Sequence, residues 1–239
     1  MKIVVINGTE KHGITYNLKE LFLKQFDNMA NVTEFDLPKD CNCFCSGCTS
    51  CFSNGEQFCK DFNCVNVIKQ AIIHCDLLVM AYPTYVFHTT GAVKALLDHL
   101  GHMWIVHRPE GAMFGKRAVI ITQCLGAGSS SAIKDVKDSL CWWGISKIYS
   151  FKGAIMDSSI FWDEISEKRK AALSNKIIKL GKKIKRIDFS RPARTSFIVK
   201  MKFLIVRLMQ KNILKSEIKS IDAEYWEKNG WLGKIRPWK

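Results

Sequence analysis

The chain has 239 residues, 47% of them hydrophobic, and a formal charge of +14 at pH 7. This length and apolar content fit one α/β domain with a C-terminal appendage, and the apolar stretches are too short and too interrupted by charge to cross a bilayer. The charge excess is local: residues 1–161 hold 15 Lys and Arg against 14 Asp and Glu, whereas residues 162–239 hold 21 against 8.

The first part of the chain predicts a strand, a loop and a helix. Ile3 to Ile6 is an unbroken β-branched run, as expected of a parallel strand covered on both faces. Asn7 to Thr15 is then a loop, which in an open parallel sheet lies at the carboxyl edge, where ligands bind. The helix that follows is marked by apolar residues at helical spacing: Leu18, Leu21, Phe22 and Phe26.

This loop has the composition of a phosphate site. Gly8 and Gly13 allow close approach of the backbone, Thr9 and Thr15 supply hydroxyl groups, and Lys11 supplies positive charge. The start of the next helix adds unpaired N–H groups and the positive end of its dipole. An ordinary tight turn without a ligand is the alternative interpretation.

Two common nucleotide motifs are disfavoured. The spacing Gly8-x4-Gly13 approaches a nucleotide-triphosphate loop, but Ile14 stands where that motif needs Lys. The dinucleotide fingerprint Gly-x-Gly-x-x-Gly is absent here, and the later Gly126-Ala-Gly128 lacks its third glycine. A mononucleotide phosphate is the remaining common ligand.

Strands and helices alternate along the rest of the domain. Such alternation predicts right-handed crossovers and a doubly wound parallel sheet, here of five strands. The further strands are predicted at Val32 to Leu37, Leu77 to Ala81, Arg117 to Thr122 and Ile145 to Ala154. The helices are predicted at Val65 to His74, His88 to Met103 and Ser129 to Leu140, with a closing helix marked by Leu173, Ile177, Leu180 and Ile184.

Three loops give the chain a resemblance to flavodoxin-like flavoproteins, in particular the NADPH-dependent FMN reductases and iron-sulfur flavoproteins. Asn7 to Tyr16 resembles that group's Gly-Ser-x-Arg phosphate loop, with Thr9 for the serine and Lys11 for the arginine, although it is one residue shorter. Ala81 to Tyr85 resembles the Ser-Pro-x-Tyr loop beside the isoalloxazine ring. Thr122 to Gly128 is similar to the glycine-rich flavin loop.

The resemblance covers residues 1 to about 155 and implies a flavodoxin-like α/β fold that binds FMN. It implies an FMN-dependent NAD(P)H oxidoreductase, a homodimer or homotetramer, that passes electrons to a small-molecule or protein acceptor. We expect the glycines of the third loop to let backbone N–H groups approach the flavin pyrimidine ring. The implied FMN-binding residues are Thr9, Lys11, Gly13, Ile14, Thr15, Tyr16, Pro83, Thr84, Tyr85, Val86, Thr122, Gln123, Gly126, Ala127 and Gly128.

Seven of the ten cysteines crowd into residues 41–64, after the second predicted strand. Because no signal peptide precedes the first strand and the core needs no cross-links, we expect thiols in a reducing cytoplasm. Within the stretch, Cys45-x2-Cys48-x2-Cys51-x7-Cys59 resembles the motif of iron-sulfur flavoproteins, which implies a 4Fe-4S cluster on these four thiolates. Zinc on the same ligands and a metal-free loop are the alternatives. With a cluster, the protein would be an electron carrier between FMN and that cluster.

We place a domain boundary at residue 187, so that residues 1–187 form the FMN-binding domain and residues 188–239 form a basic, partly helical extension. In the extension, Phe197, Met201, Leu204, Ile205 and Leu208 lie at helical spacing. We expect this stripe to pack on the domain or on a partner subunit while the lysines stay solvated. A basic amphipathic helix lying on an acidic membrane is the less favoured alternative. No nucleic-acid-binding motif is visible, so we expect no such partner.

Overall fold

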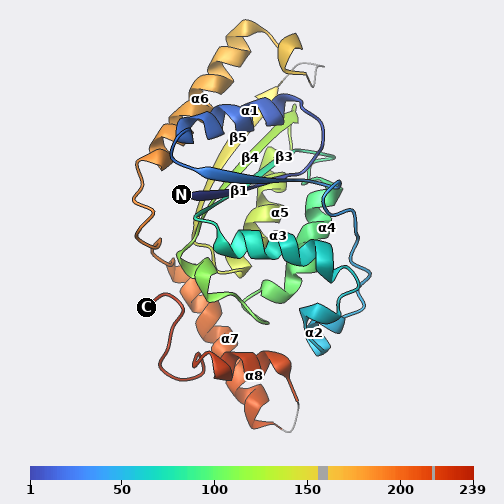
Figure 1. The fold of residues 1–239 in the computed structure, drawn as a ribbon, viewed down its shortest axis with the longest axis vertical. Helices are drawn as coiled ribbons and strands as arrows, with labels where there is room; N and C mark the ends of the chain where they lie inside the picture. The colour runs from blue at the N-terminus through green and yellow to red at the C-terminus, as the bar shows by residue number, and fades with distance from the viewer. Residues whose placement is uncertain (156–160, 217–218) are drawn as a thin grey trace.

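The structure is a computed structural model that describes residues 1–155, 161–216 and 219–239. Its centre is a five-stranded sheet with the strand order β2-β1-β3-β4-β5, in which every neighbouring pair is parallel (Figure 1). This order is flavodoxin-like, and the predicted fold class is confirmed. The strands are β1 (Lys2–Asn7), β2 (Asn31–Asp36), β3 (Leu77–Pro83), β4 (Arg117–Leu125) and β5 (Lys147–Ile155).

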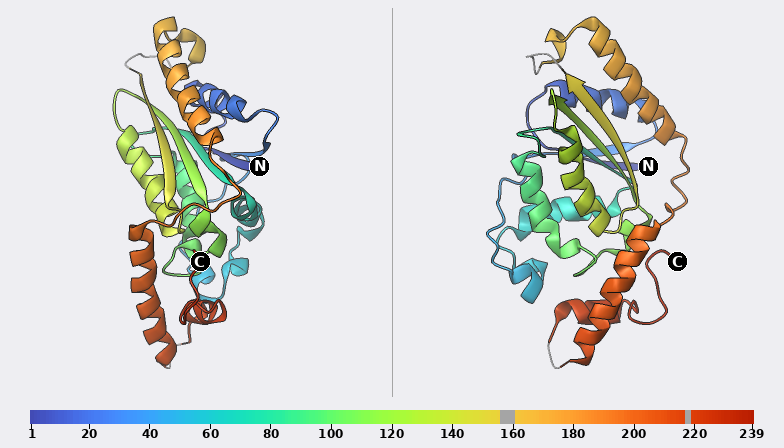
Figure 2. Two further views of the ribbon diagram at one scale, coloured as in Figure 1. Left: turned by 90° about the vertical axis from the view of Figure 1, so that its left-hand side faces the viewer. Right: turned by 180° about the vertical axis from the view of Figure 1, so that it is seen from behind.

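Helices cover both faces of the sheet (Figures 1 and 2). α1 (Ile14–Leu23) and α6 (Glu167–Lys185) pack on one face, and α3 (Phe62–His74), α4 (Gly91–His99) and α5 (Ser129–Trp142) pack on the other. α2 (Ser50–Ser53), α7 (Phe197–Lys215) and α8 (Ile221–Lys228) complete the α-helices of the described residues. Short 3-10 helices lie at Lys24–Phe26, Glu56–Phe58, Leu100–Met103, Gly111–Gly115 and Trp162–Glu164.

Burial along the strands follows their position in the sheet. β3 lies in the middle, and all of its residues are buried, as a strand covered on both faces requires. β2 is an edge strand and is mostly exposed. Between β1 and the first helix, Gly8 is fixed by crowding: a Cβ atom there would lie 2.5 Å from Tyr82 Cβ and 2.8 Å from Thr90 Oγ1. The phosphate loop therefore starts at a point where no side chain fits.

The C-terminal extension packs on the domain through an aromatic cluster of its own. Phe203 of α7 contacts the rings of Trp226 and Trp231, at centroid distances of 4.6 and 5.7 Å, and Phe114 of the domain meets it edge-on at 5.7 Å. All four side chains are buried. The extension is thus joined to the domain by a hydrophobic core.

The prediction that the stripe from Phe197 to Leu208 packs on the domain is wrong. The stripe from Phe197 to Leu208 is exposed, and Val199, Phe203 and Val206 on the opposite side pack on the domain instead. The reason is that α7 is apolar on two sides, so either stripe satisfies helical periodicity. Within the described ranges, none of the helices is long and apolar enough to span a membrane.

Candidate functional site

A cavity of about 210 Å³ opens at the carboxyl edge of the sheet, where the loops after β1, β3 and β4 meet. Nine of the predicted FMN-binding residues line it, together with Leu125, which the sequence analysis did not include. Leu125 ends β4 between the predicted Gln123 and Gly126, and its side chain is 45% exposed. The lining residues are Thr9, Lys11, Gly13, Ile14, Thr15, Pro83, Thr84, Tyr85, Gln123 and Leu125.

One end of the cavity is suited to an anion. α1 begins at Ile14 after Gly13, and no side chain of the described residues caps its first amides. Its first turn carries no acidic residue, so the positive end of the helix dipole is not neutralised there. Thr15 is 5% exposed, and its Oγ1 finds no hydrogen-bond partner within the described chain. With Lys11 also in the lining, these are the kinds of group that favour an anion such as a phosphate.

Pro83, Tyr85 and Gln123, from the carboxyl ends of β3 and β4 and the loop after β3, also line the cavity. Gln123 Oε1 is buried, and no group in the described ranges bonds to it. Behind the lining, Thr122 is fully buried, and its hydroxyl lies 3.2 Å from that of Thr84. Thr122 therefore supports the cavity wall from behind. An unpaired buried acceptor costs about 1–3 kcal/mol, so Gln123 marks a place where a ligand donor would stabilise the protein.

A tight turn forms the rim beside Tyr85. The backbone N–H of Tyr85 donates to His88 O (3.0 Å), and that of His88 donates back to Tyr85 O (2.9 Å). Between them, Val86 and Phe87 have positive φ angles of 47° and 67°, which are strained for these side chains. Asp135 of α5 holds the turn by accepting from His88 Nδ1 at 3.0 Å. The contact with Asp135 therefore fixes this turn as an apolar rim of the cavity. Val86 is 91% exposed and points to solvent.

The remaining predicted residues lie beside the cavity. Gly126 has φ +78°, but its backbone N–H donates to Ile155 O of β5 (2.9 Å), so this amide is engaged in the structure and not free for a flavin as expected. Gly128, at φ +104°, packs against Phe87. Tyr16 stacks on the ring of His12, with centroids 4.0 Å apart. Among the described residues, Tyr16, Val86, Thr122, Gly126, Ala127 and Gly128 do not line the cavity.

A family model for NADPH-dependent FMN reductases matches residues 1–155. The chain belongs to the NADPH-dependent FMN reductase family. It is therefore an FMN-dependent NAD(P)H oxidoreductase. An NADPH azoreductase of Bacillus sp. strain OY1-2 is 30% identical to it over 142 residues, which are 59% of this chain and 68% of that protein.

Solved structures show the same fold. An azoreductase of Bacillus anthracis strain Sterne aligns over 77% of this reductase and 99% of its own chain, with a TM-score of 0.62 and 15% identity. An FMN-dependent NADH-azoreductase of B. anthracis strain Ames Ancestor, solved in complex with FMN, aligns over the same shares with a TM-score of 0.59 and 13% identity. At these identities, the likeness concerns the fold.

The cysteine stretch of the reductase divides into two groups. In the first group, Cys64 Sγ lies 2.8 Å from Cys41 Sγ and 3.9 Å from Cys43 Sγ. Burial, with Cys41 beside it, raises the pKa of Cys64 to about 11, and a hydrogen bond with Asp61 raises the pKa of Cys43 to about 11. These thiols stay protonated at neutral pH, so this group is structural.

The second group contains the four predicted metal ligands. Burial raises the pKa of Cys51, and the neighbouring thiolates of Cys59, Cys45 and Cys48 raise it further. Cys48 is fully exposed, and hydrogen bonds from Ser50 lower its pKa. Among the described residues, Cys59 is the one of these four thiols that belongs to a group of potential metal ligands within 4.8 Å of one another, so the structure does not bring the four predicted ligands together as one site.

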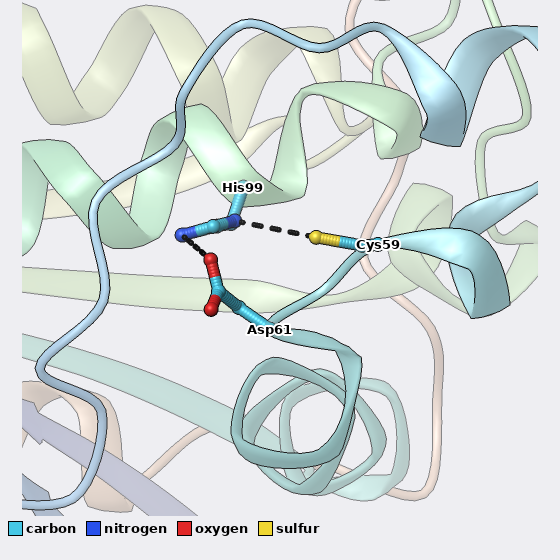
Figure 3. A group of neighbouring side chains, drawn as sticks. All are labelled: Cys59, Asp61 and His99. Carbon is cyan, nitrogen blue, oxygen red and sulfur yellow. Dashed lines mark hydrogen bonds and ion pairs between the residues drawn. The ribbon is translucent and has the colours of Figure 1, made fainter.

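An imidazole that the sequence analysis missed adjoins this second group (Figure 3). His99 Nδ1 lies 3.8 Å from Cys59 Sγ, and His99 Nε2 lies 3.6 Å from Asp61 Oδ2. The His99 side chain is only 2% exposed. A thiol, an imidazole and a carboxylate in this order can hold a metal ion or move a proton. His99 comes 40 residues after Cys59, so no local spacing in the sequence points to it.

Arg108 ties the cysteine loop to the C-terminal extension. Its buried guanidinium donates to Asp222 of α8, to the backbone oxygen of Cys51 and, at 3.3 Å, to Glu56. His107 Nδ1 lies 2.7 Å from the other oxygen of Asp222. One cation thus joins the loop, the domain and the extension.

Proposed function

We propose that this reductase takes electrons from NAD(P)H and passes them to a small planar acceptor of the quinone or azo class, at the cavity between the β1, β3 and β4 loops. The observation that carries the proposal is that two lining residues each hold a buried oxygen without a partner in the described chain: Thr15 Oγ1, beside an uncapped helix start, and Gln123 Oε1. All ten cysteines, each within the described ranges, are free thiols, which supports a reducing, cytoplasmic setting.

These residues fit FMN. The helix start, the Thr15 hydroxyl and Lys11 would hold its phosphate, and Gln123 Oε1 would accept a hydrogen bond from its ring system. When bound, FMN supplies the hydride chemistry between nicotinamide and acceptor. The chain orients the ring and limits water on it through Pro83 and Leu125.

The acceptor class is inferred from the rim. Tyr85 and Phe87 are 50% and 60% exposed beside the cavity, and Leu125 is 45% exposed. Exposed aromatic and aliphatic side chains next to a flavin give a planar acceptor a surface on which to stack. Relatives whose names include azoreductase and quinone oxidoreductase agree with such an acceptor.

Replacing Thr15 with Val tests the cavity. Valine keeps the shape of the side chain and removes the hydroxyl that would donate to a phosphate. Because a hydrogen bond to a charged group contributes about 1.5–3 kcal/mol, we expect FMN affinity to fall about tenfold to a hundredfold. Quenching of FMN fluorescence during titration of the apoprotein measures this affinity.

Thr33→Val on the exposed edge strand β2 is the matched control and should leave FMN affinity unchanged. NAD(P)H oxidation with a quinone and with an azo dye is then measured at saturating FMN, where Thr15→Val should recover most of its rate. Unchanged quenching in Thr15→Val would place the phosphate elsewhere. FMN binding without oxidation of either nicotinamide would reject the enzymatic proposal.

A second candidate function is electron transfer between FMN and a 4Fe-4S cluster. The supporting observation is that Cys59, the last cysteine of the motif, lies with His99 and Asp61 in a group of potential metal ligands whose atoms are all within 4.8 Å of one another. A 4Fe-4S cluster would require Cys45, Cys48 and Cys51 to join Cys59, whereas a thiolate, an imidazole and a carboxylate side by side also suit zinc.

Anaerobic reconstitution with iron and sulfide decides among these metals. A cluster predicts about four irons and about four sulfides per chain, and Cys48→Ser should abolish both while FMN binding persists. Cys43→Ser, in the structural group, is the control and should keep the iron. Zinc that is retained in place of iron, or no metal at all, would reject the electron-carrier function and leave the FMN proposal intact.

A further inference from the structure

The exposed side of α7 is an apolar surface that nothing in the described chain covers. Its packed side uses Val199, Phe203 and Val206, which are at most 6% exposed. The seven apolar side chains of the other side are between 37% and 77% exposed and run along most of the helix. They are Phe197, Ile198, Met201, Leu204, Ile205, Leu208 and Met209, which we call the α7 stripe.

Positive charge borders the stripe on both sides. α7 contains Lys200, Lys202, Arg207, Lys211 and Lys215 and no acidic residue. Successive residues of a helix are turned by about 100° around its axis. Seen along that axis, Lys202 lies beside Met209 on one side of the stripe, and Lys200 and Lys211 lie beside Leu204 on the other. This is an apolar strip between two cationic edges.

Three of the cations already make contacts within the protein, and the first is Lys200, whose Nζ lies 5.9 Å from the centroid of the Trp238 ring. Arg207 donates to the backbone oxygens of Trp231, Leu232 and Gly233, and Lys202 lies 3.9 Å above the Trp142 ring. The contacts of Arg207 and Lys202 fix the rotation of α7 about its own axis, so that the stripe faces outward. Lys211 and Lys215 are then the cations best placed to meet an external anion.

We propose that the α7 stripe docks on the surface of an acidic lipid bilayer. The helix would lie in the plane of the interface, with the stripe in the boundary between headgroups and acyl chains and the lysines on anionic headgroups. Figures 1 and 2 show α7 on the outside of the molecule, beyond the amino ends of β4 and β5. The cavity lies at the carboxyl edge of the sheet, in the loops after β1, β3 and β4. Docking through α7 leaves the cavity open to nicotinamide and acceptor.

Charge argues against two other occupants. In a twofold dimer the same patch meets itself, so α7 against α7 would bring cationic edges together with no acidic residue on the helix to offset them. A nucleic acid would meet the cations but would leave the apolar strip between them without a partner. A bilayer with anionic headgroups satisfies both the strip and its edges.

Vesicle co-sedimentation of the full chain tests the proposal. The protein should bind vesicles that contain phosphatidylglycerol and should not bind pure phosphatidylcholine, and its binding should weaken as salt rises. Ile205→Glu combined with Leu208→Glu should reduce the partition coefficient at least about tenfold, because two inserted apolar side chains become charged. Val67→Glu, at an exposed apolar position of α3, is the matched control and should not change it.

A charge variant separates the cationic edges from the strip. Lys211→Gln combined with Lys215→Gln should lower the partition coefficient about 30-fold, from roughly fivefold for each positive charge removed near the surface. Both double variants should keep the FMN affinity and thermal midpoint of the parent, since the substituted side chains lie away from the cavity.

Three results would overturn the proposal: no binding to anionic vesicles, equal binding to neutral ones, or full binding by the Ile205→Glu, Leu208→Glu variant. Light scattering without lipid is measured in parallel. If the variant has a lower molar mass in solution than the parent and neither protein binds vesicles, the stripe is a contact between copies of this chain. None of these outcomes depends on whether FMN or NAD(P)H is used.

Discussion

The folded protein is more stable when the imidazole of His102 is neutral than when it is protonated. Burial, with the positive charge of Lys69 nearby, lowers its pKa from 6.5 to about 4. Its Nδ1–H donates to His99 O at 3.1 Å, and its Nε2 meets no partner in the described part of the chain. Between pH 6.5 and pH 4 the unfolded chain binds a proton here that the folded protein does not. The free energy of unfolding therefore falls as the pH drops through this range.

Replacing His102 with Asn should remove this acid sensitivity. The Asn amide can take the donor position of Nδ1 but does not titrate. At pH 5 the wild type should have lost roughly 2 kcal/mol through this group relative to pH 7, whereas the variant should lose correspondingly less. Urea unfolding at the two pH values measures the difference.

His74→Asn is the matched control, because His74 makes a similar Nδ1 bond to Gln70 O at 2.8 Å but is exposed. It should leave the acid sensitivity of the wild type in place. If His102→Asn behaves like His74→Asn, another group is responsible for the acid loss.

At the scale of elements, the strands and most helices could be predicted, because each strand of the sheet interior is an apolar run between turn signals. The predicted helix from His88 to Met103 is in fact α4 from Gly91 to His99, followed by a 3-10 turn from Leu100 to Met103. Its first residues are instead held in the turn that Asp135 supports. The spacing of apolar residues along the sequence cannot predict such a tertiary contact.

The α7 face could not be predicted from pattern alone. Val199, Phe203 and Val206 follow the same helical spacing as Phe197, Met201 and Leu204, so the sequence contains two valid stripes. The aromatic rings of α8 and of the segment after it select the first set, and they lie more than 15 residues further along the chain. Likewise, the loops of the cavity were recognisable one by one, whereas the unpaired state of Gln123 Oε1 depends on the packed neighbours.

For the whole molecule, the Arg108 contacts predict that the extension stabilises the cysteine loop. Asp222→Asn keeps the shape of the side chain but removes the charge that faces this buried guanidinium. We expect the free energy of unfolding to fall by about 1–3 kcal/mol, since Glu56 still faces Arg108. Cys51, whose backbone oxygen Arg108 holds, should react faster with iodoacetamide, as measured by peptide mass spectrometry.

Asp188→Asn, an exposed aspartate of the same extension, is the control and should leave both quantities unchanged. Lower stability with unchanged labelling of Cys51 would show that loop and extension are independent.

The same contact has a consequence for how the protein is made. Asp222 lies 114 residues after Arg108, and the cysteine loop precedes both in the chain. On the ribosome, the loop emerges more than 150 residues before Asp222, a delay of roughly 10 to 30 seconds at ordinary rates of synthesis. Throughout that interval the thiols are exposed to metal ions and oxidants, because the contact between Arg108 and Asp222 has not yet formed. The speed of translation from residue 65 to residue 222, about two thirds of the message, therefore sets how long the thiols of a nascent chain can bind metal ions or be oxidised.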